Sequence, residues 1–293
     1  MSANRTSPGR RLRDAWAEQT IAIPGVFCPL VARIAERLQF PAVYLSGAAL
    51  SATLGLPDVG LVTASEFADA ARAIAAATTL PLLCDADTGF GEALNVERTV
   101  RSFESAGAAG LHLEDQVMPK QCGHLSGKSL VAPGEMAAKV RAAVAARSDP
   151  DFVIIARTDA RGVANEGFDA AVARARLYVE AGADAIFPEA LESEEEFAAF
   201  ARALPGVPLL ANATEFGKSP LPDRATLVRL GYRMVLYPVT GLRAALKAAA
   251  DVLADVATKG HQRDKLGDMM SRRELYELLG YEGYEKRDRA YFG

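Results

Sequence analysis

Residues 95–115 read NVERTVRSFESAGAAGLHLED, and this stretch contains one complete repeat of the predicted fold. From Asn95 to Ala106, apolar residues recur near helical spacing, and Gly107 follows where a helix would end. The apolar run from Gly110 to Glu114 comes next and is typical of a buried strand. The stretch therefore predicts a helix, a glycine cap and a strand that ends in an acid.

The same unit recurs along the chain. Ala181-Gly182-Ala183 and Leu230-Gly231-Tyr232 again place a glycine between a helical pattern and a strand. The eight predicted strands are Ile23 to Phe27, Ala42 to Ser46, Leu80 to Asp85, Gly110 to Glu114, Phe152 to Arg157, Ala185 to Pro188, Pro208 to Ala211 and Met234 to Tyr237. Strands that are apolar throughout indicate a parallel sheet buried on both faces. Eight such units in about 240 residues predict an α/β fold of the (β/α)8 TIM-barrel type.

A doubly wound open sheet is the alternative fold, but the first strand is not followed by a G-x-G-x-x-G pattern. We expect one barrel domain over residues 1–293. Residues 258–293 lie beyond the eighth unit, are highly charged and have a helical pattern around Arg272. This C-terminal helical appendage is expected to pack on a neighbouring subunit.

Composition excludes several classes of partner. A net charge of -4 with scattered basic residues argues against nucleic-acid binding. No apolar run approaches the roughly 20 residues that span a bilayer, and the N-terminus lacks the apolar segment of an export signal. The chain has only three cysteines, at 28, 84 and 122, so reduced thiols are expected. These features predict a cytoplasmic protein without membrane or nucleic-acid partners.

Polar residues gather after the predicted strands. They are Ser46-Gly47-Ala48, Asp85-Ala86-Asp87, Glu114-Asp115, Arg157-Thr158-Asp159, Glu189, Asn212 to Glu215, and Arg243. Because barrel enzymes build their active sites at the carboxyl ends of the strands, this pattern predicts an enzyme. The alternative is a non-catalytic barrel that binds a carboxylate or serves in an assembly. Concentrated charge costs free energy to desolvate, which argues against a scaffold.

The motif from Asp85 to Asp87 is interpreted as a metal site. In an extended chain the two carboxylates project from the same side, and Glu114 ends the adjacent strand. Carboxylates with water favour Mg²⁺ or Mn²⁺ over softer metals. The alternative is that the two aspartates only cap the following turn.

The stretch KQCGHLSGK, residues 120–128, leaves three interpretations of Cys122 open. With His124 it could ligate zinc, although a structural zinc site normally needs four ligands. It could be an ordinary loop cysteine. Because Lys120, His124 and Lys128 would lower its pKa, it could also be a proton donor or nucleophile. His112, which lies between two leucines, is interpreted as packed near the barrel mouth.

Several motifs together resemble the isocitrate lyase/phosphoenolpyruvate mutase superfamily. They are LSGAALSATLGLPDVG, DADTGFG, LHLEDQ, KQCGH with Lys128, ARTDA, FPEA, NATEFG and LYPVTGLRA, and the resemblance extends from about residue 10 to 285. NATEFG, LYPVTGLRA and SRRELYELLGYEGYE most resemble the branch that cleaves 2-methylisocitrate to pyruvate and succinate in propionate catabolism. The resemblance implies a (β/α)8 barrel, a Mg²⁺ ion, a di- or tricarboxylate substrate and a homotetramer.

The resemblance also implies roles for individual residues. The metal residues would be Asp85 and Asp87, with Asp58 and Glu114 around them. The substrate-binding residues would be Ser46, Gly47, Ala48, Cys122, Gly123, Arg157, Glu189, Asn212, Thr214, Arg243 and Arg272. The catalytic residues would be Cys122 as proton donor, Arg157, Lys120, His124, and Tyr44 as the candidate base. Tyr44 could equally be a core residue, and His124 an ordinary surface residue.

Two positions depart from the family pattern. Gln121 stands where relatives carry Arg or Lys, and Ala48 stands where they carry Gly. Loss of a cation beside the thiol leaves the pKa of that thiol less depressed. A substituted malate or oxaloacetate is therefore the alternative substrate, as in 2,3-dimethylmalate lyase or oxaloacetate hydrolase.

Overall fold

Eight parallel strands form the centre of the computed structural model, which describes residues 6–121, 123 and 127–292. The strands are β1 (Ile21–Pro24), β2 (Val43–Leu45), β3 (Leu82–Asp85), β4 (Gly110–Glu114), β5 (Val153–Thr158), β6 (Ala185–Pro188), β7 (Leu210–Asn212) and β8 (Met234–Tyr237). Strands β2 to β6 form one sheet in sequence order, and β1, β8 and β7 form another. Bridges from Gly25 to Tyr44 and from Ile186 to Leu209 join the two sheets. The predicted TIM barrel is therefore confirmed.

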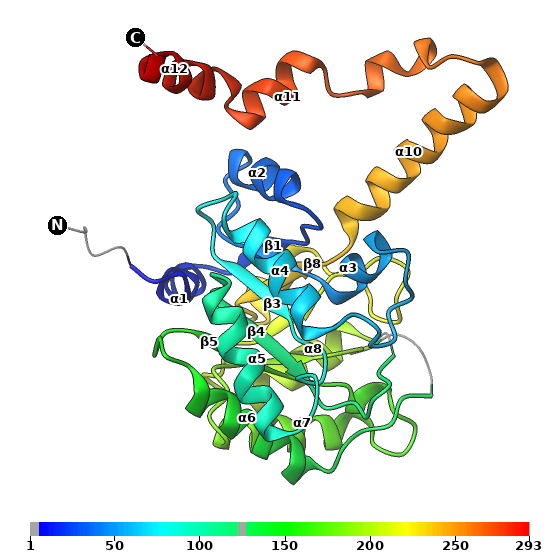
Figure 1. The fold of residues 1–293 in the computed structure, drawn as a ribbon. Coiled ribbons are helices and arrows are strands. Elements are labelled where there is room, and N and C mark those ends of the chain that lie inside the picture. The colour runs from blue at the N-terminus through cyan, green and yellow to red at the C-terminus, as the bar shows by residue number, and fades with distance from the viewer. Residues whose placement is uncertain (1–5, 122, 124–126, 293) are drawn as a thin grey trace.

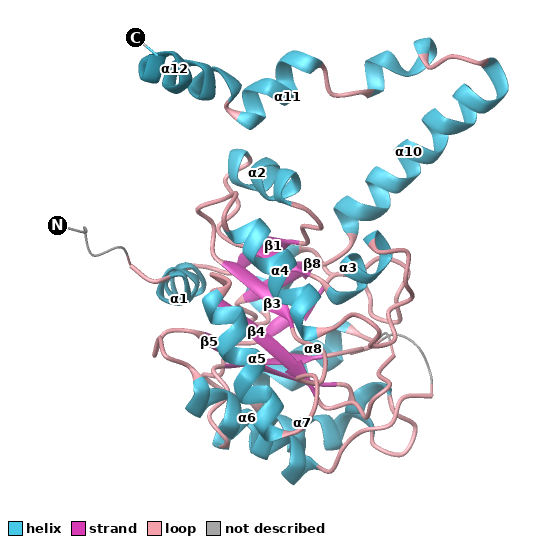
Figure 2. Cartoon of the chain, in the orientation of Figure 1, coloured by secondary structure: helices cyan, strands magenta, loops and turns pink. Residues whose placement is uncertain are grey.

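Most helices lie on the outside of the barrel around the strands, and those at the C-terminus project from it (Figures 1 and 2). The helices are α1 (Pro8–Glu18), α2 (Pro29–Arg37), α3 (Gly47–Thr53), α4 (Ala64–Ala75), α5 (Ala93–Ser105), α6 (Pro133–Ala146), η1 (Ala160–Gly162), α7 (Gly167–Glu180), α8 (Glu194–Ala203), α9 (Arg224–Arg229), α10 (Thr240–Lys259), η2 (Arg263–Asp268), α11 (Arg272–Leu279) and α12 (Tyr281–Phe292). No helix in the described ranges is long and apolar enough to cross a bilayer.

The core has two layers because alternate strand residues point inward and outward. Ile21, Ile23, Val153 and Leu210 belong to an inner cluster that fills the barrel, and Leu12 and Trp16 of α1 belong to the same cluster. A larger cluster lies between the strands and the outer helices. Both faces of each strand are buried, which explains why the strands are continuous apolar runs in the sequence.

The repeat that begins with Asn95 folds as predicted. Helix α5 ends at Ser105, and Gly107 takes the positive φ of 91° that favours glycine. At Gly110, the first residue of β4, a Cβ atom would lie 2.6 Å from the carbonyl oxygen of Val153. Neighbouring strands can approach this closely only because residue 110 has no side chain.

Strand β1 begins and ends earlier than predicted. The sequence pattern placed it at Ile23 to Phe27, whereas its register with β8 runs from Ile21 opposite Met234 to Pro24 opposite Tyr237. At Gly25 a Cβ atom would overlap the backbone of Pro238. The amide of Gly25 still donates to the carbonyl of Tyr237 in β8, 2.8 Å away, but the amide of Val26 donates to the carbonyl of Tyr44 in β2, also 2.8 Å away.

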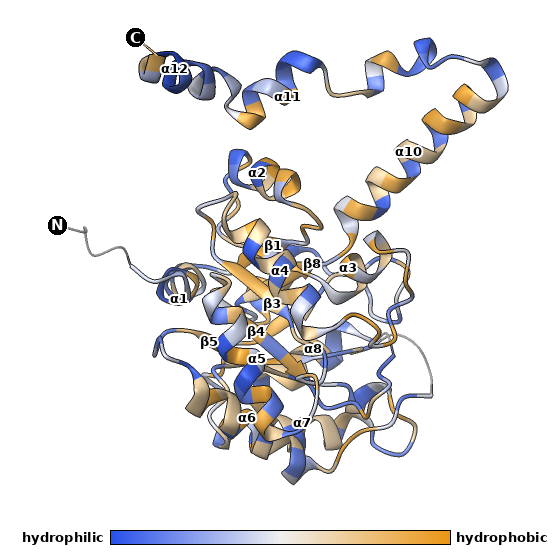
Figure 3. Ribbon diagram, in the orientation of Figure 1, coloured by the Kyte–Doolittle hydropathy of each residue, from blue (hydrophilic) through white to orange (hydrophobic). Residues whose placement is uncertain are grey.

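The C-terminal region projects from the barrel as helices (Figure 1). Helix α10 leaves the end of β8 and runs for 20 residues, and helix α11 then returns to lie beside α2. There Arg33 NH1 donates to the carbonyl oxygens of Leu278 and Leu279, at 3.3 and 3.0 Å. Figure 3 shows apolar residues along α10, and Leu246 and Leu253 on this helix are exposed. C-terminal helices are present as predicted, but the projecting region begins with α10 at Thr240, earlier than the predicted residue 258. The packing of these helices on another subunit stays a prediction.

Candidate active site

A cavity of about 90 Å³ opens at the carboxyl ends of the strands. Its polar lining residues come from all parts of the barrel: Tyr44, Ser46, Asp58, Asp85, Lys120, Gln121, Arg157, Glu189, Asn212, Thr214 and Arg243. Gly123 and Ala48 also line it, as do Phe187, Leu236, Pro238 and Val239. The structure thus brings most of the predicted site residues together around one cavity.

Asp85 lies at the centre of the acidic part of the cavity. Its Oδ2 accepts from the amide of Gly47 at 3.0 Å, and its Oδ1 accepts from the amide of Asp87 at 3.1 Å. Burial would raise the pKa of Asp85, but His112, Lys120 and Arg157 outweigh burial and lower the pKa to about 2. Asp85 is therefore a carboxylate throughout the neutral pH range.

Lys120 joins two of the predicted metal residues. Its Nζ lies 2.9 Å from Oδ1 of Asp87 and also donates to Oδ1 of Asp58. Burial and the neighbouring Asp85 charge raise the pKa of Asp87 to about 7, against the opposing effect of Lys120. Asp87 also has a positive φ of 45°, which is uncommon for a residue other than glycine. The turn after β3 therefore holds this carboxylate in a strained and buried position.

Tyr44 and His112 form a buried hydrogen-bonded chain with Asp85. The Tyr44 hydroxyl lies 2.8 Å from Nε2 of His112 and 3.2 Å from Oδ2 of Asp85. Burial lowers the pKa of His112 to about 4, so the imidazole is neutral, and burial raises the pKa of Tyr44 well above its usual value. His112 packs between Tyr44 and Phe187. It is packed near the barrel mouth as predicted, and it also contacts the candidate base.

Arg157 is surrounded by carboxylates. Its Nε and NH2 donate to the two oxygens of Asp159, at 2.9 and 3.1 Å. Its NH1 lies 3.4 Å from Glu114 and 3.5 Å from Glu189. Burial would lower the pKa of Arg157, but Asp159, Glu114 and Glu189 raise it well above its usual value. One edge of the guanidinium is thus held by Asp159 while the other faces the cavity.

Amide and hydroxyl groups complete the lining of the cavity. Asn212 Nδ2 donates to Glu189, with the shorter distance 3.1 Å to Oε2, and Thr214 lines the cavity beside it. Ser46 caps α3, because its hydroxyl accepts from the amide of Ala49 at 3.3 Å. Arg243 reaches the cavity from α10 and forms an ion pair with Glu215 at 2.9 Å.

The carboxylates fit a hard divalent cation that keeps some of its water. No group of three or more His, Cys, Asp or Glu residues in the described ranges converges directly on one metal position. Oε1 of Glu114 is nevertheless buried without a hydrogen-bond partner, and Oδ1 of Asp87 accepts no well-aligned hydrogen bond. Mg²⁺ commonly uses one or two carboxylates together with water and substrate oxygens. The all-oxygen donor set therefore fits Mg²⁺ better than a metal that requires a full protein cage.

Six predicted site residues are not among the described residues that line this cavity. Gly47, Asp87 and Glu114 lie beside it, where they contact Asp85, Lys120 and Arg157 respectively. Cys122 and His124 lie outside the described residues. Arg272 begins α11, which lies beside α2, and is exposed. Its role, like those of Cys122 and His124, stays a prediction.

Sequence reasoning assigned no role to a buried network behind Arg157. Asp115 accepts from the Thr158 and Tyr178 hydroxyls, both at 2.8 Å, and from the amide of Asp159 at 2.9 Å. Arg174 adds an ion pair to Asp115 at 3.4 Å. The only signal in the sequence was the spacing of Arg157 and Asp159, which allowed both to point to the same side of the strand end.

Gly47→Ala is expected to reduce kcat/KM by about 10-fold, because a small displacement of a reacting group is costly. A Cβ atom at this position would lie 2.9 Å from Oδ2 of Asp85 and 3.2 Å from Phe67. The matched control is Gly134→Ala, where a Cβ atom would meet nothing within 4 Å. Steady-state kinetics of the two variants check this expectation, and equal activity of both would contradict it.

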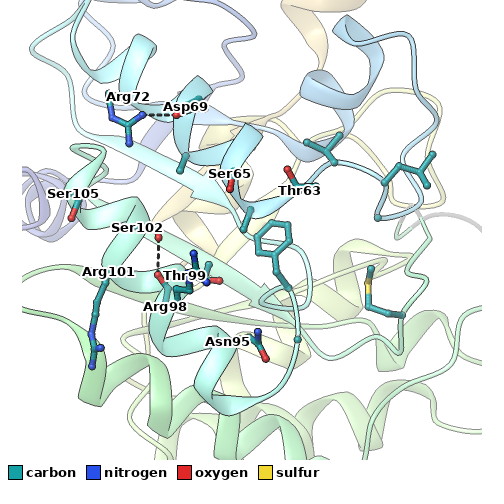
Figure 4. Close-up of a pocket in the computed structure, with 18 residues that line it drawn as sticks. Thr63, Ser65, Asp69, Arg72, Asn95, Arg98, Thr99, Arg101, Ser102 and Ser105 are labelled. Atoms are coloured by element: carbon teal, nitrogen blue, oxygen red, sulfur yellow. Dashed lines mark hydrogen bonds and ion pairs between the residues drawn. The ribbon is translucent and has the colours of Figure 1, made fainter.

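A much wider hollow, of about 1130 Å³, lies elsewhere, between α4 and α5 on the outside of the barrel (Figure 4). Residues of the two helices line it, among them Asp69, Arg72, Arg98 and Ser102. None of the described residues that line it is a predicted site residue. The candidate site is therefore chosen by its buried, paired charges and not by the size of the cavity.

The fold and the cavity define a (β/α)8 enzyme whose polar site combines cations with carboxylates and suits an acidic small molecule. Residues 12–257 match the family model described as phosphoenolpyruvate phosphomutase, and the chain belongs to this family. The resemblance inferred from the motifs is thereby confirmed.

Comparison with individual proteins gives both close relatives and solved structures. The chain is 55% identical over 282 residues to the 2-methylisocitrate lyase of Aeropyrum pernix, a match that covers 96% of this chain and 90% of the relative. It is 35% identical to oxaloacetate acetylhydrolase in complex with 3,3-difluorooxalacetate, with a TM-score of 0.92 and 98% of each chain covered. It is 34% identical to phosphonopyruvate hydrolase in complex with oxalate and Mg²⁺, with a TM-score of 0.89. That match covers 98% of this chain and 100% of the other.

Proposed function

We propose that the protein is a metal-dependent carbon–carbon lyase that cleaves 2-methylisocitrate to pyruvate and succinate. The Aeropyrum pernix relative with this name is 55% identical, whereas the oxaloacetate acetylhydrolase is 35% identical. The observation that carries the proposal is the juxtaposition of Arg157 and Lys120 with the buried carboxylate of Asp85 around one cavity. Such a site can bind an acidic substrate and a divalent cation side by side.

Asp85 and Asp87 would hold the Mg²⁺ ion, with Asp58 and Glu114 positioned around it through water. Phosphonopyruvate hydrolase, whose solved complex contains Mg²⁺ and oxalate, supports a divalent metal in this fold. When bound, Mg²⁺ would polarise the substrate hydroxyl and the carboxylate next to it. Mn²⁺ has similar ligand preferences and could replace it.

The substrate carboxylates would be bound by cations and amides from several strand ends. The inward edge of Arg157 can bridge substrate oxygens, because Asp159 occupies its other edge. Ser46, Gly47 and Ala48 at the start of α3 can bind one carboxylate. Asn212, Thr214 and Arg243, which also line the cavity, can bind another. Glu189 would hold the end of the substrate near the metal. Arg272 would have to come from another subunit or a moved α11.

Tyr44 is the candidate acceptor of the substrate's hydroxyl proton. Its raised pKa keeps the phenol protonated at rest, so it needs a partner for its own proton. His112, with Nε2 at 2.8 Å, is the nearest neutral partner.

Cys122 is the candidate proton donor. Bond cleavage would leave a carbanion on the departing succinate, and the thiol of Cys122 would protonate it. Gln121 and Gly123 on either side of this cysteine line the cavity. His124 and Lys120 would tune that thiol or hold the residues around it.

The site is proposed to work in a homotetramer in the cytoplasm. Support for assembly comes from exposed apolar residues on the C-terminal helices, among them Leu246, Leu253 and Leu266. A neighbouring subunit would cover these residues and could supply Arg272.

A substrate panel tests the proposed function. Pyruvate release would be measured with 2-methylisocitrate and 2,3-dimethylmalate, glyoxylate release with isocitrate, and acetate release with oxaloacetate, all with Mg²⁺. We expect kcat/KM for 2-methylisocitrate to exceed the others by at least about 10-fold, since pocket contacts to one or two methyl groups discriminate by that order. A higher value of kcat/KM for dimethylmalate or oxaloacetate would favour the alternative lyase or hydrolase. That alternative is included because Gln121 and Ala48 depart from the family pattern.

A further inference from the structure

Lys128 is a buried cation that does not line the active-site cavity. Its side chain is 0% exposed, as is that of Asp159, and the Nζ to Oδ1 distance between them is 2.8 Å. The same ammonium donates to the carbonyl oxygen of Gly123. A buried ammonium is costly unless it is paired and hydrogen-bonded, so these two contacts determine where the Lys128 side chain can lie.

Asp159 connects Lys128 to the guanidinium of Arg157. Its two oxygens accept from Nε and NH2 of Arg157, and its backbone amide donates to Asp115. Burial would raise the pKa of Asp159, but the charges of Arg157 and Lys128 lower it below its usual value. One carboxylate therefore balances two buried cations, of which one faces the cavity and the other holds Gly123.

Gly123 packs directly against the substrate-facing groups. A Cβ atom here would lie 2.4 Å from NH2 of Arg157 and 2.5 Å from Cγ of Glu189. On the other side of Cys122, the amide of Gln121 donates to Gln116 at 2.9 Å. Cys122 is thus flanked in the chain by two anchored residues, and one of the two anchors is the Lys128 ion pair.

We propose that Lys128 and Asp159 are positioning residues for proton transfer, because their ion pair holds the peptide that follows Cys122 against Arg157. The inference rests on the proposed function in one respect, the role of Cys122 as proton donor. It assigns a role to two residues that do not line the substrate cavity: they hold the Gly123 peptide against the substrate-bridging guanidinium.

Lys128→Met is the direct test, since methionine has a similar length but neither charge nor donors. We expect kcat to fall by about 10- to 100-fold, the cost of misplacing a catalytic group by a fraction of an ångström to an ångström. The KM for 2-methylisocitrate should stay within about threefold, because ground-state substrate contacts remain. The matched control is Lys139→Met, a lysine of similar burial on α6, which should keep wild-type kinetics.

A second substitution moves the ammonium without removing a charge. A Cβ atom at Gly162 would lie 3.0 Å from Nζ of Lys128, whereas one at Gly134 would meet nothing within 4 Å. Gly162→Ala should therefore lower kcat by several-fold, about 3- to 10-fold. Gly134→Ala should not change it.

Hydrogen–deuterium exchange separates this inference from the proposed function. Peptides that contain Gly123 should exchange faster in Lys128→Met than in the wild type or in Lys139→Met, whichever substrate the enzyme uses. Unchanged exchange would overturn the positioning role. If exchange is faster in Lys128→Met but this variant keeps the kcat of the wild type on a confirmed substrate, the part of Lys128 in proton transfer would be overturned. If the wild type cleaves none of the four acids, the proposed function fails, and the exchange result still decides whether Lys128 holds Gly123.

Discussion

Asp87→Asn is expected to lower lyase turnover by at least about 1000-fold, because loss of a metal carboxylate removes several kcal/mol of transition-state stabilisation. Asparagine also tolerates the positive φ of 45° found here, so the turn after β3 should be preserved. Burial raises the pKa of Asp87 to about 7, which means that the charged carboxylate is less stable in the folded protein than in water. Removal of this carboxylate should therefore not lower the melting temperature.

Metal binding and turnover should be lost together in this variant. Mn²⁺ binding, followed by electron paramagnetic resonance, should weaken strongly, and circular dichroism should be unchanged. Asp69→Asn is the control, because Asp69 is exposed on α4, where it pairs with Arg72. A variant that remains active and indifferent to metal would remove Asp87 from the proposed metal site.

Cys122→Ser is expected to lower turnover by on the order of 1000-fold, within the range that a positioned general acid contributes. A serine hydroxyl is a far weaker acid than a thiol, so it cannot protonate the departing carbanion at a useful rate. Mn²⁺ affinity and the melting temperature should both stay at their wild-type values.

Cys28→Ser is the matched control for the thiol substitution. Cys28 is the N-cap residue of α2 and is only partly buried, so serine should be tolerated there. Rates would be measured by pyruvate release in single-turnover and steady-state assays. Wild-type cleavage by Cys122→Ser would show that another group donates the proton, and His124 would then be the next candidate to replace.

The sequence predicted the barrel because buried parallel strands have a simple local signature. Each strand is apolar on both faces because both faces are buried. The helix before a strand commonly ends near a glycine such as Gly107, which has a positive φ. The same logic placed Asp85, Glu114 and Arg157 at the carboxyl ends of neighbouring strands, where parallel chains must bring them together. Local patterns are sufficient for these predictions, because an apolar run indicates a buried strand and the alternation of strands with helices indicates a parallel sheet.

The pairing of charges depended on the tertiary structure. Lys120 contacts Asp58, 62 residues earlier in the chain, and Lys128 reaches Asp159 across the strand ends. Nothing local determines such pairs, because they depend on the paths that the loops take after each strand. The early end of β1 at Pro24 and the position of α11 beside α2 have the same origin. The sequence by itself determined the barrel and the rim on which the reactive groups lie. Only the tertiary structure decided which buried charges neutralise one another, because a buried charge is stable only beside the particular partner that folding brings to it.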